Sequence, residues 1–133
     1  MSATPGVTAP LAGRHTLRYR VLARALASLH AAYAMFAVFG GLLVLRWPSL
    51  MMLHLLAVLW ALATMTLDLG CYLTHWEKAL WRRGGSEPYP EGFLQHHVLR
   101  HTFPEERSRL YHAMLGAAAL ALNVAIYGLL VLR

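Results

Sequence analysis

The sequence predicts an all-α membrane protein with three transmembrane helices and short interfacial helices between the second and the third. Two observations carry this prediction. Hydrophobic residues make up 58% of the 133 residues and charged residues only 14%, whereas soluble domains are about half apolar and a quarter charged. The twelve Lys and Arg residues lie at the edges of three apolar runs, as basic residues do beside membrane spans.

The N-terminal part of the chain is expected to differ from the rest. Residues 1–13 are rich in Ala, Gly, Pro, Ser and Thr and have no periodic apolar pattern, which is typical of disordered segments. We therefore predict a disordered tail over residues 1–20 and a single three-helix transmembrane domain over residues 21–133. Within this domain we expect three spans, at residues 25–45, 49–69 and 112–132.

The first two spans are expected to form a helical hairpin. Residues 25–45 supply the roughly 20 apolar residues that cross a hydrocarbon core. They continue into Arg46 without the small-residue site at which a secretory signal is cleaved. Pro48 follows, and a proline can end one helix and open the next. The connection between the second and third spans, residues 72–109, is long enough to carry interfacial helices.

The N-terminus is expected to be cytoplasmic. Two of the twelve Lys and Arg residues, Arg46 and Arg133, lie in the first turn and at the C-terminus, and the other ten lie before the first span and in residues 72–109. Positively charged segments tend to stay on the cytoplasmic side. No nucleic-acid partner is expected, because these residues do not form a basic face with interleaved aromatic side chains.

The interfacial connection contains two helix signals. Thr74 followed by Glu77 has the spacing of a capping box, in which each side chain binds a free backbone N–H at a helix start. This pattern predicts a short helix from Trp76 to Arg83, which Gly84 and Gly85 would end. A second short helix is expected from Phe93 to His101, before Pro104.

Polar and small residues recur at helical spacing along one face of each span. We interpret these faces as the bundle interior, where polar groups form hydrogen bonds between helices. His54 would lie about 8 Å inside the outer edge of the hydrocarbon core and Tyr127 about 10 Å inside it. We therefore predict a structural hydrogen bond between them. Asn123 is a further polar member of this interior.

A cofactor site is the alternative interpretation of these faces. His30 and His54 would differ in depth by about 14 Å, so they could not share one haem iron. His30 and His112 both lie near the cytoplasmic edge, with Asp68 nearby. These three residues are the candidate site for a haem or metal, and the identity of the cofactor stays open.

Two histidine-containing pairs form a candidate metal site at the interface. Cys71 and His75 are four residues apart, as are His97 and His101. Side chains at this spacing lie on one face of a helix. Together the two pairs could supply four ligands to zinc or copper.

Several residues and short segments along the chain match one known family: Leu29-His30, residues 40–48, His54-Leu55, Trp60, residues 70–74, Glu77, Tyr89, residues 92–94, His96 and residues 123–127. On these residues the chain resembles the small bacterial membrane proteins grouped as the domain of unknown function DUF2784. Two substitutions depart from the family pattern: Tyr72 stands where proline is usual, and His97 stands where tyrosine is expected. The resemblance implies a bacterial inner-membrane protein with no assigned activity.

Three functional hypotheses follow. The first is a non-enzymatic accessory or assembly component that contacts the lipid bilayer, belongs to a larger membrane complex or homo-oligomer, and has no complete catalytic constellation. The second is a redox protein that binds a cofactor through His30 and His112. The third is an enzyme acting on lipid at the interface through Glu77, His75 or Cys71.

Overall fold

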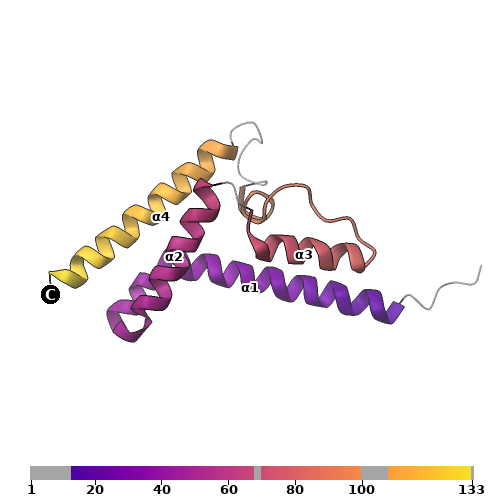
Figure 1. Cartoon of the computed structure of the whole chain (residues 1–133), viewed down its shortest axis with the longest axis horizontal. Coiled ribbons are helices and arrows are strands. Elements are labelled where there is room, and N and C mark those ends of the chain that lie inside the picture. The colour runs from indigo at the N-terminus through magenta and orange to yellow at the C-terminus, as the bar shows by residue number, and fades with distance from the viewer. Residues whose placement is uncertain (1–12, 68–69, 100–107, 133) are drawn as a thin grey trace, which may run out of the picture.

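The computed structural model describes residues 13–67, 70–99 and 108–132, and these residues form helices joined by short connections. Figure 1 shows the elements in order along the chain. They are the helix α1 (Gly13–Arg46), a 3-10 turn η1 (Pro48–Leu50), the helices α2 (Met51–Thr66) and α3 (Tyr72–Arg83), a π-helical turn η2 (Gln95–Leu99) and the helix α4 (Ser108–Val131). None of the described residues forms a strand.

Three segments are long and apolar enough to cross a membrane, which confirms the predicted fold class. They are Gly13–Arg46, Pro48–Thr66 and Leu110–Val131. On α2 and α4, large apolar side chains point outward, for example Leu59 at 65% exposed and Val124 at 63%. Such side chains need a hydrocarbon environment, because apolar surface in water is unfavourable.

The helix α1 is longer than the bilayer requires. Its 34 residues extend about 51 Å, whereas a hydrocarbon core is about 30 Å thick. The prediction of a disordered tail over residues 1–20 is wrong for residues 13–20, which are helical; residues 1–12 lie outside the described part of the chain. The missing signal was tertiary, because Arg20 Nε donates to the backbone oxygen of Gly84 at 2.9 Å.

The connection between α1 and α2 is the predicted tight turn. Trp47 N–H donates to Leu43 O at 2.7 Å and closes the last turn of α1. Trp47 itself is non-helical, with φ −131° and ψ 86°, because the ring of the following Pro48 disfavours the α conformation in the residue before it. The hairpin places α2 beside α1.

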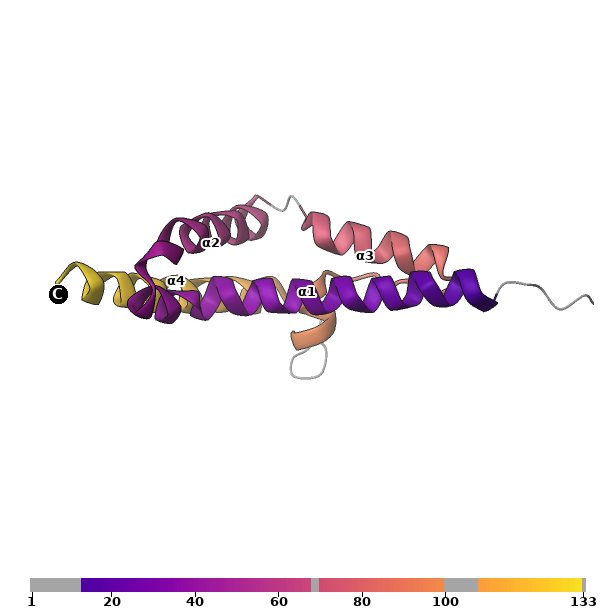
Figure 2. The ribbon, with the colours of Figure 1, turned by 90° about the horizontal axis from the view of Figure 1, so that it is seen from below.

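The interfacial helix α3 lies along the N-terminal half of α1 (Figures 1 and 2). It ends at Arg83 as predicted, with Gly85 at φ +70°. Ser86 N–H donates to Trp81 O and Gly85 N–H to Arg82 O, both at 3.0 Å, which is the Schellman pattern that favours glycine at this position.

The second predicted interfacial helix corresponds in part to η2, which runs to Leu99. His101 and Pro104 lie outside the described residues. The third span begins at Leu110, two residues before the predicted start at His112. The second span ends at Thr66, and residues 68–69 of the predicted span are not described.

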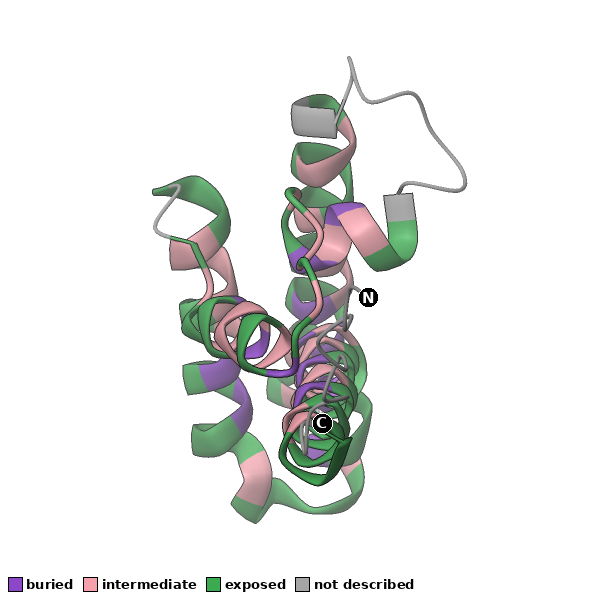
Figure 3. Cartoon of the chain, turned by 90° about the vertical axis from the view of Figure 1, so that its right-hand side faces the viewer, coloured by how far each residue is buried: buried purple, intermediate pink, exposed green. Residues whose placement is uncertain are grey.

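Buried residues lie where the helices face one another (Figure 3). On α1 they are mainly small, with Ala23, Ala37, Gly40 and Gly41 buried, so backbones can approach closely. Buried polar side chains are as numerous as buried hydrophobic ones among the described residues. The polar set is His30, His54, Thr74, Glu77, Gln95 and Asn123.

Candidate functional site

One polar cluster lies inside the three-helix bundle. His54 is fully buried, and its Nδ1 shares a hydrogen bond of 2.8 Å with the Tyr127 hydroxyl. This confirms the predicted contact between α2 and α4. The edge of Phe36 on α1 packs against the imidazole at 5.3 Å between ring centroids, so His54 joins all three spans.

Gly40 makes room for this cluster. A Cβ added at residue 40 would lie 2.6 Å from His54 Cδ2 and 2.8 Å from Phe36 Cδ2, closer than non-bonded carbon atoms approach one another. The absence of a side chain therefore lets the imidazole lie directly against the α1 backbone. His54 Nε2 is buried and has no hydrogen-bond partner in the structure.

Asn123 ties α4 to α1 through backbone carbonyls. Its Nδ2 donates to Ala37 O at 3.2 Å and Val38 O at 3.3 Å, and to Ala119 O in its own helix at 2.9 Å. The side chain is 4% exposed. The amide nitrogen donates to these carbonyl oxygens without carrying a charge. Interhelical hydrogen bonds of this type contribute about 0.6 to 2 kcal/mol in membranes.

A second polar cluster lies under α3, and Glu77 is its centre. The Glu77 carboxylate is 1% exposed. It accepts hydrogen bonds from the Tyr89 hydroxyl at 3.0 Å and from Trp81 Nε1 at 3.3 Å. A buried carboxylate needs such donors, because unpaired burial of a charge is very costly. Glu77 therefore fixes the loop that carries Tyr89 against α3.

The predicted capping box of Thr74 and Glu77 is wrong. The helix α3 begins at Tyr72, its N-cap is Cys71, and no side chain caps it. Thr74 is buried inside the first turn, and the Glu77 side chain points to Tyr89 and Trp81. The two residues have the right spacing for a box, but the burial of Glu77 under Tyr89 decides its partners.

Lys78 of α3 binds the backbone of the same loop. Its Nζ donates to Pro90 O at 3.1 Å and to Glu91 O at 2.7 Å, and it lies 5.0 Å from the centroid of the Tyr89 ring. Burial, and then the negative charge of Glu77, raise the pKa of Tyr89 above its ordinary value. The phenol therefore stays a hydrogen-bond donor.

A column of stacked rings connects this loop to α1. Tyr89 stacks on His96 at 4.1 Å, His97 on Phe93 at 4.4 Å, and Phe93 on His30 at 4.0 Å between centroids. The rings of His96 and His97 meet edge to face at 4.9 Å. His30 and Phe93 are both buried, so the column closes the space between α1 and the loop.

The structure leaves the predicted cofactor site at His30, His112 and Asp68 untested. His30 lies in the ring column, and His112 is half-buried near the start of α4. Asp68 lies outside the described residues. Within the parts of the chain that are described, no three His, Cys, Asp or Glu side chains are grouped so that they could hold a metal ion.

The predicted interfacial metal site is partly outside the described chain, because His101 is not described. Its other members have local contacts. His75 Nδ1 lies 3.1 Å from Cys71 O, one turn away in α3, and His97 Nδ1 lies 3.2 Å from Phe93 O. Cys71 is a free thiol.

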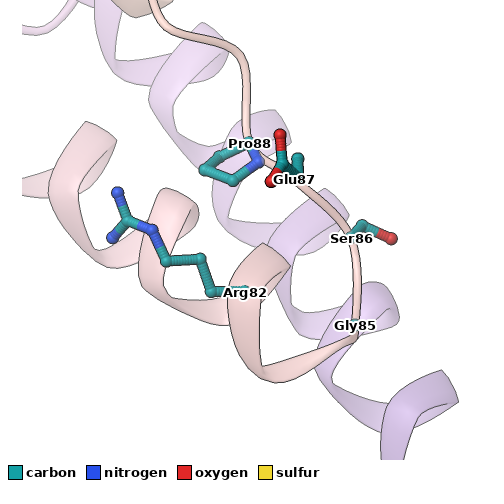
Figure 4. Close-up of a pocket in the computed structure, with 5 residues that line it drawn as sticks. All are labelled: Arg82, Gly85, Ser86, Glu87 and Pro88. Carbon is teal, nitrogen blue, oxygen red and sulfur yellow. The ribbon is translucent and has the colours of Figure 1, made fainter.

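A shallow hollow of about 310 Å³ lies at the end of α3 and is lined by Arg82, Gly85, Ser86, Glu87 and Pro88. Figure 4 shows Arg82 extending along α3, with Glu87 and Pro88 on the loop opposite and Ser86 pointing away. The lining carries one positive and one negative side chain, so the two charges offset each other.

Comparison with known proteins identifies the family. A family model described as Protein of Unknown function (DUF2784) matches residues 20–128. The chain belongs to the DUF2784 family. No curated protein and no solved structure matches it. The match runs from the N-terminal half of α1 into the last turns of α4, so the DUF2784 domain includes both polar clusters.

Sequence reasoning did not assign roles to several residues of this DUF2784 chain. Trp81 follows Glu77 by four residues, a spacing that places both on one helix face and could have indicated their contact. Tyr89, Phe93 and Gln95 carry no such local signal. Their positions depend on how the loop folds back onto α1 and α3.

Proposed function

We propose that this chain is a multi-pass protein of the bacterial inner membrane that acts without catalytic chemistry, as an accessory or assembly component of a membrane complex. In this proposal the N-terminus lies in the cytoplasm. The distribution of basic residues supports this orientation. The three apolar helices support a membrane location.

The observation that carries the proposal is that both oxygens of the buried Glu77 carboxylate accept hydrogen bonds from other side chains. An acidic group used for proton transfer needs access to the proton that it moves. The Glu77 carboxylate is instead almost fully buried and accepts hydrogen bonds from Tyr89 and Trp81. Asn123 and His54 are likewise bonded between helices. These contacts favour a structural use of the polar groups.

The surface best suited to a partner is the outward face of α3. Tyr72 is 65% exposed and Trp76 is 62% exposed, and they lie one helical turn apart. Tyr72 also stacks on Trp60 of α2 at 6.1 Å. Exposed Trp and Tyr side chains on a fixed element are typical of interaction surfaces at the membrane boundary.

Photo-crosslinking in living cells tests this proposal. A photoreactive amino acid is placed at Tyr72 or Trp76, and at Leu59 on the lipid-facing side of α2 as a control. We expect a discrete protein adduct from the α3 positions and none from Leu59. Adducts to lipid alone at both α3 positions would contradict an accessory role in a protein complex.

The competing hypothesis of a cofactor protein is supported by one observation. His30 is 7% exposed, and its Nδ1 has no hydrogen-bond partner in the structure. Absorption spectra and metal analysis of the purified full chain separate the two hypotheses. The accessory role predicts no Soret band. A Soret band that is abolished by His30→Ala or His112→Ala would overturn it.

A further inference from the structure

An apolar groove lies between α1 and α3. Its lining consists of Leu22, Ala25, Leu26 and Leu29 from α1 and Leu80 from α3, and it holds about 280 Å³ with no polar surface. The four α1 residues follow the spacing of one helix face. Leu22 is 52% exposed and Leu29 is 58% exposed, so the groove is open along its length.

Two arginines lie at one end of this groove. Arg18 precedes Leu22 by four residues, and Arg83 follows Leu80 by three, so each lies one turn from a groove residue on the same helix face. Both are exposed. The helices α1 and α3 run in opposite directions (Figure 1), and the bond from Arg20 to Gly84 O sets these two ends at the same level.

The groove also lies at a suitable depth for a lipid. The predicted first span, residues 25–45, places the inner edge of the hydrocarbon core near Ala25. Leu26 and Leu29 then lie inside the core, and Leu22 lies about 5 Å outside it, in the headgroup layer. The apolar part of the groove points toward the hydrocarbon, and the arginines lie on the aqueous side.

We propose that this groove binds one anionic phospholipid of the cytoplasmic leaflet. The lipid phosphate lies between Arg18 and Arg83, where guanidinium groups form charge-assisted hydrogen bonds to phosphate oxygens. One acyl chain lies along the face from Leu22 to Leu29 and covers the apolar surface that the groove leaves exposed. This proposal rests on the proposed cytoplasmic side of the N-terminus, and it does not depend on the accessory role.

Native mass spectrometry of the full chain in a mild detergent tests the proposal. The protein is titrated with phosphatidylglycerol, with phosphatidylcholine and with glycerol phosphate, which carries the headgroup charge without acyl chains. We expect one phosphatidylglycerol to bind about tenfold more tightly than phosphatidylcholine. Glycerol phosphate should not displace it. Equal binding of the two lipids, or displacement by glycerol phosphate, would overturn the proposal.

Paired variants locate the site. The double variant Arg18→Gln/Arg83→Gln should weaken phosphatidylglycerol binding about tenfold or more. The matched control Arg24→Gln/Arg82→Gln removes the same charge from other faces of the two helices and should change binding less than twofold. Ala25→Phe fills the groove without touching the arginines and should also abolish tight binding. An equal loss in the control, or full binding by Ala25→Phe, would contradict this site.

Discussion

At the scale of single residues, several buried polar groups are stabilised by specific partners in this chain. Glu77 is the clearest example, because its carboxylate is almost fully buried and has two donors, Tyr89 and Trp81. Removing the acceptor of a buried donor costs more free energy than the hydrogen bond itself contributes. The donor is then buried without a hydrogen-bond partner from either water or protein. This cluster therefore stabilises the fold only when Glu77, Tyr89 and Trp81 are all present.

Glu77→Ala should lower the free energy of unfolding by about 1 to 3 kcal/mol, because the Tyr89 hydroxyl and the Trp81 indole lose their acceptor. Glu77→Gln keeps one oxygen acceptor and should cost less. Thermal unfolding in detergent, followed by circular dichroism, measures both. Glu87→Gln, at an exposed position, is the control and should change little. A larger loss for Gln than for Ala would contradict the assignment.

The pH dependence of stability follows from Tyr89. Its pKa is raised in the folded chain by burial and by Glu77, whereas an unfolded tyrosine has a pKa near 10. Above about pH 10 the unfolded chain releases a proton that the folded chain retains, so the free energy of unfolding falls as pH rises. Below that pH this contribution is constant.

Tyr89→Phe should make this alkaline decline less steep, although it also lowers stability at neutral pH by removing the bond to Glu77. Unfolding curves between pH 8 and pH 11 provide the measurement. Tyr72→Phe, which alters an exposed ring, is the matched control and should keep the wild-type slope. A Tyr89→Phe variant with an unchanged slope would show that another group titrates.

At the scale of elements, the contacts between helices decide what sequence patterns could and could not predict. The hairpin at Pro48 and the end of α3 at Gly84 were predictable, because proline and glycine act on the local backbone. The bond between His54 and Tyr127 was predictable because helix geometry fixes depth in a bilayer. Each of these predictions needs only the local sequence of one element or the thickness of the bilayer.

Two features of the structure were not predictable from local patterns. Residues 13–20 are helical and belong to the part of α1 that packs against α3, where the bond from Arg20 to Gly84 O spans 64 residues. The Glu77 partners depend on a loop that returns to α3 twelve residues later, at Tyr89. Tertiary contacts of this kind override local helix signals.

Two glycine substitutions should have opposite effects on stability, because Gly40 lies in the contact of α1 with α2 and Gly128 lies at an open position of α4. Gly40→Ala should destabilise the bundle by about 1 to 3 kcal/mol, because the added Cβ would meet His54 and Phe36. Gly128→Ala has no neighbour within 4 Å of the new Cβ and should be neutral or slightly stabilising, as alanine favours helices. Unfolding of both variants in detergent measures the difference. Equal stability would contradict the close approach at Gly40.

At the scale of the whole molecule, the chain combines a three-helix membrane unit with an extension that includes α3. The C-terminal half of α1 packs with α2 and α4, and its N-terminal half carries α3 and the loop of residues 84–94 (Figures 1 and 2). Basic residues lie mainly on this extension. The central feature is therefore a three-helix membrane unit whose first helix carries α3 and this loop as a platform.

Cysteine labelling in intact cells tests this feature most directly. In a Cys71→Ser background, Glu87→Cys reports on the platform and Leu132→Cys on the end of the third span, each with an impermeant maleimide. We expect Leu132→Cys to be labelled in intact cells and Glu87→Cys to be labelled only after permeabilisation. Labelling of Glu87→Cys alone would show the inverted orientation, and equal labelling of both in intact cells would contradict three membrane spans.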